Sequence, residues 1–72
     1  MKHFVVKVKD QDLFFNADEM MGEFICEAPM LLNKFQADDI MKYCPDEIFH
    51  LDEDKYFSKK DLEIRQVELN FI

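Results

Sequence analysis

The chain has 72 residues, of which 49% are hydrophobic, and it carries sixteen acidic side chains against nine basic ones, a net charge of −7. This apolar content excludes a disordered acidic tail, which could not bury enough apolar surface to offset the entropy lost on ordering. The negative charge argues against direct binding to nucleic acid or anionic membranes, and the apolar runs are far shorter than the ~20 residues of a membrane span. We therefore expect one soluble domain spanning residues 1–72.

The first two predicted elements form a β-hairpin. In His3–Lys9 every second residue from Phe4 to Val8 is apolar, which is the two-residue period of a half-buried strand. Asp10–Asp12 has the composition of a turn, and Leu13–Phe15 predicts the second strand.

The middle of the chain is predicted to hold a third strand and then short helices. The only glycine, Gly22, indicates a loop, and a third strand is expected over Glu23–Glu27. Pro29 suits the first turn of a short helix that continues through Phe35, because a missing N–H costs nothing there.

A second short helix is predicted to begin at Asp38 and Asp39, whose carboxylates suit the positive end of a helix dipole. Pro45 is expected to end it. A short extended segment at Ile48–Phe49 and a charged turn at Asp52–Asp54 are predicted to follow.

The C-terminal part is predicted to contain a helical turn and a final strand. Ser58 is followed three residues later by an acid, as in a capping box, which predicts one turn over Lys59–Leu62. Alternation in Val67–Phe71 predicts the strand. The apolar residues before it fall in the other register, so a bulge or an element boundary is expected near Arg65 and Gln66.

Strands at both ends with short helices between them predict an α+β fold. We expect a small antiparallel sheet of three to five strands, with one or two short helices packed on one face. An exposed edge strand could pair with a second copy, so a homodimer is a secondary expectation.

Calcium and zinc sites are poorly supported. Asp52, Asp54 and Glu63 have the spacing of three EF-hand ligands, but Tyr56 and Phe57 stand where that loop needs a ligand and a glycine. The potential zinc ligands show no paired spacing; they are Cys26, Cys44, His3 and His50. We expect no bound metal and no cofactor.

Catalytic chemistry is also poorly supported. Ser58 is the only serine, and Cys26 and Cys44 have no adjacent histidine to activate them, so both are interpreted as small buried hydrophobes. A single glycine cannot build a phosphate-binding loop. We expect no enzymatic activity, and the sparse cysteines and lack of a recognisable signal peptide favour a reducing bacterial cytoplasm.

The acidic charge is concentrated in the middle of the chain. Residues 10–54 carry thirteen acids against two lysines, a net charge of −11, whereas the segments on either side are net positive. Such a field attracts basic protein surfaces and speeds their encounter. The candidate partner-binding residues are acids of this region, namely Asp38, Asp39, Asp46, Glu47, Asp52, Glu53 and Asp54.

An apolar run beside acidic residues is a further candidate for an interface. It contains Phe14, Phe15, Met20 and Met21, and methionine and phenylalanine side chains are common in adaptable binding surfaces. Packing in the core is the alternative interpretation for each of these side chains.

The chain also resembles a known class of proteins in outline. The opening Met1–Val8, an aromatic pair soon after it, Asn33–Phe35 before a short helix, and a final alternating strand are similar to small accessory proteins encoded by phages and prophages of Gram-positive bacteria. This resemblance implies an intracellular protein without enzymatic activity that binds a host protein. It also implies that the acidic surface could inhibit a host nucleic-acid-acting protein.

The leading hypothesis is thus a small acidic module that docks on a basic protein surface. The alternative is a structural or self-associating protein, such as a homodimer, whose acidity serves only solubility.

Overall fold

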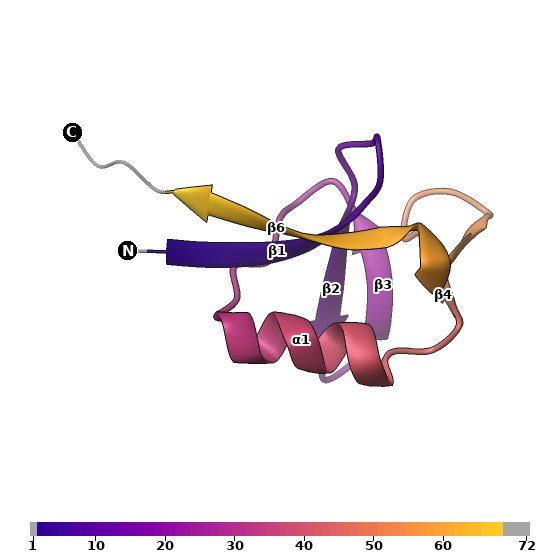
Figure 1. Cartoon of the computed structure of the whole chain (residues 1–72). Coiled ribbons are helices and arrows are strands. Elements are labelled where there is room, and N and C mark those ends of the chain that lie inside the picture. Colours follow the sequence, from indigo (N-terminus) through magenta and orange to yellow (C-terminus); the bar gives the residue numbers. More distant parts are fainter. Residues whose placement is uncertain (1, 69–72) are drawn as a thin grey trace.

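The computed structural model describes residues 2–68, which form two antiparallel sheets and one α-helix (Figure 1). The elements in chain order are β1 (Lys2–Val8), β2 (Phe14–Asp18), β3 (Gly22–Cys26), α1 (Lys34–Tyr43), β4 (Glu47–Phe49), β5 (Tyr56–Ser58), the 3₁₀ turn η1 (Lys59–Asp61) and β6 (Leu62–Glu68). The main sheet has the order β3-β2-β1-β6, and β4 pairs only with β5. The α+β prediction is confirmed.

The core lies between the main sheet and α1, which packs against β1 and β6 (Figure 1). Alternate residues of β1 point into it, and Val6 is fully buried. The helix contributes Ala37, which is also fully buried, so a small side chain allows α1 to approach the sheet closely. The prediction that a helix packs on one face of the sheet is confirmed.

The β1–β2 connection turns where the sequence predicts it. Asp10 has a φ of 61°, a left-handed conformation that aspartate tolerates better than most residues. The Gln11 N–H donates to the Val8 carbonyl at 3.3 Å. The loop predicted at Gly22 is also confirmed, since Gly22 has a φ of 76° at the start of β3.

The helix predicted to start at Pro29 is absent, because this segment pairs with β1 instead. Leu32 and Phe4 form an antiparallel bridge in which each N–H donates to the other carbonyl at 2.8 Å. Leu32 is buried in the core. These two long-range hydrogen bonds and the burial of Leu32 favour an extended chain over a helical turn.

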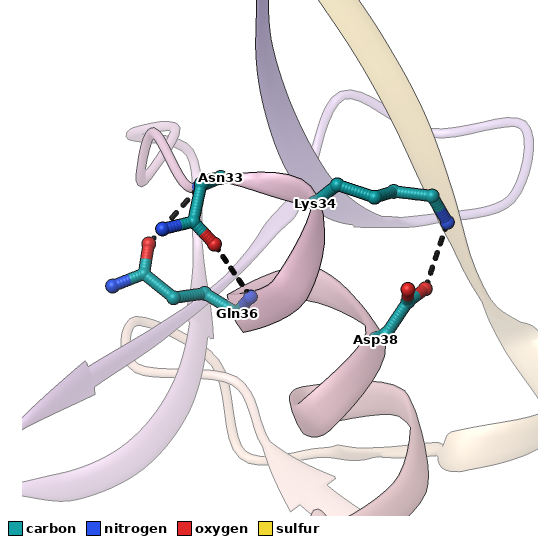
Figure 2. A network of polar contacts seen from close by, with 4 residues as sticks. All are labelled: Asn33, Lys34, Gln36 and Asp38. Carbon is teal, nitrogen blue, oxygen red and sulfur yellow. Dashed lines mark hydrogen bonds and ion pairs between the residues drawn. The ribbon is translucent and has the colours of Figure 1, made fainter.

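One helix, α1, replaces the two that the sequence predicts, and it starts at a capping box. The Asn33 side chain accepts from the Gln36 N–H at 2.7 Å, and the Gln36 side chain accepts from the Asn33 N–H at 3.0 Å (Figure 2). This pair satisfies two otherwise unbonded N–H groups, so the helix begins here. Asp38 and Asp39 therefore lie in mid-helix and not at its start. The expected end before Pro45 is confirmed, with Cys44 as the C-cap.

The β4–β5 hairpin attaches to the outer edge of β3. Ile25 and His50 form a parallel bridge, and the Leu51 N–H donates to the Ile25 carbonyl at 2.8 Å. The predicted extended segment at Ile48–Phe49 lies within β4. The predicted turn after Ser58 is confirmed as η1, with the Ser58 hydroxyl accepting from the Lys60 N–H at 3.2 Å.

Strand β6 is longer and more regular than predicted. Its register with β1 runs without interruption from Leu62↔Val8 to Glu68↔Lys2, so the prediction of a bulge or an element boundary near Arg65 and Gln66 is wrong. Apolar residues occur in both registers, and Val5, which pairs with Arg65 and not with a residue of the Val6 register, is only 2% exposed. The predicted strand residues from 69 onward lie outside the described part of the chain.

Candidate protein-binding surface

All seven acids predicted to bind a partner are exposed, and they lie on three parts of the fold. Asp38 and Asp39 belong to α1, Asp46 and Glu47 to the junction of α1 with β4, and Asp52–Asp54 to the β4–β5 turn. That turn stands well apart from α1 (Figure 1). The seven carboxylates thus form three local sites of different character.

The two acids of α1 differ in their neighbours. Asp38 pairs with Lys34, one helical turn earlier, at 2.8 Å (Figure 2). Both side chains are more than half exposed, so this pair contributes only a few tenths of a kcal/mol. Asp39 has no ion-pair partner within residues 2–68, and it lines a groove.

Asp46 and Glu47 share an open depression with three lysines. The depression has a volume of about 700 Å³, and the lysines that line it are Lys9, Lys59 and Lys60. Two of these lysines also donate hydrogen bonds to the backbone. Lys59 Nζ donates to the Lys42 carbonyl, and Lys9 Nζ donates to the Lys60 carbonyl, each at 3.0 Å. We call this region the mixed-charge depression, because its acids are compensated by nearby cations.

The acids of the β4–β5 turn are held by local contacts. The Asp52 N–H donates to Nδ1 of His50 at 3.1 Å, and His50 is only 5% exposed. Glu53 pairs with Lys55 at 3.2 Å. The turn therefore presents Asp52 and Asp54 on a backbone anchored by a buried imidazole.

A groove between α1 and the ends of β2 and β3 is the feature that the sequence did not indicate. The buried or half-buried lining residues Phe15, Ile40 and Cys44 form its apolar floor. The exposed lining residues Ala17, Glu23, Asp39 and Tyr43 form its rim. We call it the acid-rimmed groove. Its volume is about 230 Å³. These residues are up to 29 positions apart along the chain (15 to 44), so no local pattern could predict the site.

Exposed apolar side chains occur on α1 and in the turn between β2 and β3, and these three elements line the groove. Tyr43, on α1 and on the rim, is 71% exposed, and Phe35 on α1 is 74% exposed. Met20 and Met21, in the β2–β3 turn, are 93% and 50% exposed. The predicted apolar run thus divides: Phe15 packs in the core, whereas the two methionines remain available for contact.

Cys44 lies at the floor of the groove and keeps its proton. Burial raises the pKa of its thiol above the ordinary value; the charge of Lys59 opposes this rise, and that of Glu23 adds to it. A neutral thiol is a poor nucleophile. Cys26 is also buried and neither cysteine forms a disulfide, so the interpretation of both as small buried hydrophobes is confirmed.

Two further classes of site were sought in the described residues. Within residues 2–68, no three histidine, cysteine or acidic side chains are grouped so that they could hold a metal ion. No helix in this part of the chain is long and apolar enough to cross a membrane.

No protein-family model, curated protein or solved structure matches this chain. Its function is therefore inferred from the chemistry of its own surface.

Proposed function

We propose that the protein is a small acidic binding module, without enzymatic activity, that docks on a basic surface of a partner protein. The observation that carries this proposal is the state of the predicted carboxylates. All seven are exposed, and three of them, Asp39, Asp52 and Asp54, have neither an ion-pair partner within residues 2–68 nor a place among the lysines of the mixed-charge depression. Unpaired surface charge of one sign steers a partner of the opposite sign into contact.

The class of partner follows from the resemblance to phage and prophage accessory proteins. A host protein that acts on nucleic acid has a basic surface for phosphates, and an acidic module can occupy that surface. Binding would then compete with nucleic acid and inhibit the host protein in the bacterial cytoplasm.

The test is capture of partners on the immobilised protein from a Gram-positive bacterial lysate, at about 0.05 M and about 0.5 M salt. We expect nucleic-acid-acting proteins to be captured at low salt, to be lost at high salt, and to be released by added DNA or RNA. Reversing the charges of Asp52–Asp54 should weaken capture. The matched control reverses Asp10 and Asp12, which are also exposed but lie outside the candidate set. Capture that is equal at both salt concentrations would contradict the proposal.

A self-associating protein is the second candidate, and strand β6 favours it. This strand lies at the edge of the main sheet. If two copies paired antiparallel about Ile64, Glu63 of each copy would stand opposite Arg65 of the other, which is a favourable cross-strand pair. Light scattering on Arg65→Glu decides between the two: loss of a wild-type dimer supports self-association, and a monomeric wild-type protein excludes it.

A further inference from the structure

The size of the acid-rimmed groove limits what it can hold. Its volume of about 230 Å³ is below the range of about 300–1,000 Å³ typical of sites for drug-sized ligands. It is large enough for one long side chain of a protein partner. Occupied pockets of this kind, filled by a single anchoring side chain, often dominate the affinity of an interface.

The lining of the groove selects the chemistry of that side chain. Ile40 and Ala17 offer an apolar surface, while Glu23 from β3 and Asp39 from α1 place carboxylates on two different walls. Neither carboxylate has an ion-pair partner within residues 2–68. An apolar stem that ends in a cation matches this arrangement, because such side chains bury the stem and keep the charge at the rim.

Two properties of the guanidinium group favour arginine over lysine as this cation. A guanidinium presents five N–H donors in a planar fork, so it can bond to two carboxylates at once. It also stacks on aromatic rings, and the mostly exposed ring of Tyr43 lines the groove. The Lys42 ammonium lies 5.2 Å from the centroid of this ring, which leaves the other face of the ring for a guanidinium.

We infer that the acid-rimmed groove binds an arginine side chain of a basic partner protein, with its stem over Ile40 and Ala17 and its guanidinium between Glu23 and Asp39. This inference rests on the proposed function and makes it specific. Two charges act on the buried thiol of Cys44: Lys59 has the larger effect and lowers its pKa, and Glu23 raises it. Lys59 lines the mixed-charge depression and donates to the Lys42 carbonyl, so the charged side chains that line the groove itself are Glu23 and Asp39.

The test uses capped five-residue peptides, Gly-Ser-X-Ser-Gly, in which X is arginine, lysine or citrulline. Amide chemical shifts of the isotope-labelled protein are followed during titration. We expect the arginine peptide to shift the amides of Ala17, Glu23 and the C-terminal half of α1, and the uncharged citrulline peptide to shift none. Equal effects of arginine and lysine would overturn the assignment to a guanidinium, and equal effects of citrulline would overturn the role of the two carboxylates.

The matched variants are Glu23→Gln and Asp39→Asn in the groove, with Glu27→Gln as the control, an exposed acid that follows β3 and does not line the groove. Loss of a charge-assisted hydrogen bond should weaken arginine binding about tenfold for each groove variant and leave the control unchanged. All three side chains are exposed, so the variants should fold, and unchanged amide shifts elsewhere would verify this. An equal loss in Glu27→Gln would overturn the inference.

The same variants separate this inference from the proposed function. If salt-sensitive capture of nucleic-acid-acting proteins persists unchanged in the Glu23→Gln, Asp39→Asn double variant, the groove is not the anchor, and the proposed function stands without it. If wild-type capture is insensitive to salt, the proposed function fails. An arginine peptide that still binds in the groove would then support the inference for a partner of another class.

Discussion

The acid-rimmed groove and the mixed-charge depression are both hollows on one small acidic protein, yet they offer a partner opposite conditions. The depression has about three times the volume of the groove, and its two acids face three lysines. The groove has two acids on its rim and no lysine in its lining. A large hollow with compensated charge attracts a charged partner weakly, whereas a small one with uncompensated charge can select a single cation. The net charge of residues 10–54, which contain the acids of both hollows, does not distinguish the groove from the depression.

Charge reversal in the two regions should give the largest difference. We expect Glu23→Lys with Asp39→Lys to weaken binding of a basic partner by at least about a hundredfold, because like charges placed together at an interface cost several kcal/mol. The matched reversal of Asp46 and Glu47 in the depression should cost less than about tenfold. Titration calorimetry with a captured partner measures both, and comparable losses would remove the distinction between the regions.

Loss of the capping box should weaken the helix that forms one wall of the groove. We expect Asn33→Ala to lower the free energy of unfolding by about 1 kcal/mol, since the Gln36 N–H loses its acceptor. Urea denaturation followed by circular dichroism measures the change. Asn33→Asp is the control, because aspartate is an equally good N-cap, and it should retain most of the stability. A loss as large as in Asn33→Ala would mean that the cap is not the cause.

Besides burial, the pKa of the Cys44 thiol depends on a charge from each hollow, Lys59 of the depression and Glu23 of the groove. Because burial raises its pKa in the folded state, the folded protein keeps this proton at pH values where the unfolded chain loses it. The free energy of unfolding should therefore fall as the pH rises above the ordinary thiol pKa, and this contribution should be constant below it. Cys44→Ala should lack this part of the alkaline loss in denaturation measured as a function of pH.

Two variants sharpen that measurement. Glu23→Gln should lower the pKa of Cys44, and Lys59→Gln should raise it, with Lys59 giving the larger change. The ¹³Cβ chemical shift of Cys44 as a function of pH follows the ionisation directly. Shifts of the same sign in the two variants would contradict the placement of Cys44 between a negative and a positive region.

The smallest effect is expected for the ion pair on α1. Lys34→Ala should change the free energy of unfolding by at most about 0.5 kcal/mol, because both partners are exposed. Denaturation at low and high salt measures it. A loss above about 1 kcal/mol would show that Lys34 also stabilises the fold through the ring of Phe4, which lies 6.0 Å from its Nζ.

Local patterns were sufficient to predict the first three strands and their turns, but they missed β5 and the start of β6 at Leu62, and they were insufficient where distant contacts decide the conformation. Alternation in β1, the turn at Asp10 and the loop at Gly22 all depend on neighbouring residues, and each was predicted. Pro29 suits a helix locally, but the bridge between Leu32 and Phe4 holds this segment extended.

The helix start and the groove illustrate two different limits. The sequence analysis placed a helix start at Asp38 and Asp39 and missed the capping box that Asn33 and Gln36 form. The groove was not visible at all, because packing brings Glu23 and Asp39 together from separate elements. Counting acids indicated an acidic surface, and only the positions of the lysines show where that acidity is uncompensated.

The attachment of the β4–β5 hairpin to β3 has a consequence for aggregation. The bridge between Ile25 and His50 occupies one edge of the main sheet, so β6 is left as the edge that can recruit a further strand. A fibril needs two open edges on every subunit, one to receive and one to offer. The bridge hinders strand addition on the β3 side of the main sheet at Ile25, so the addition of a further copy is favoured at β6. Copies that pair through β6 are expected to carry partly covered β3 edges on the outside of the pair, which disfavours growth into longer assemblies.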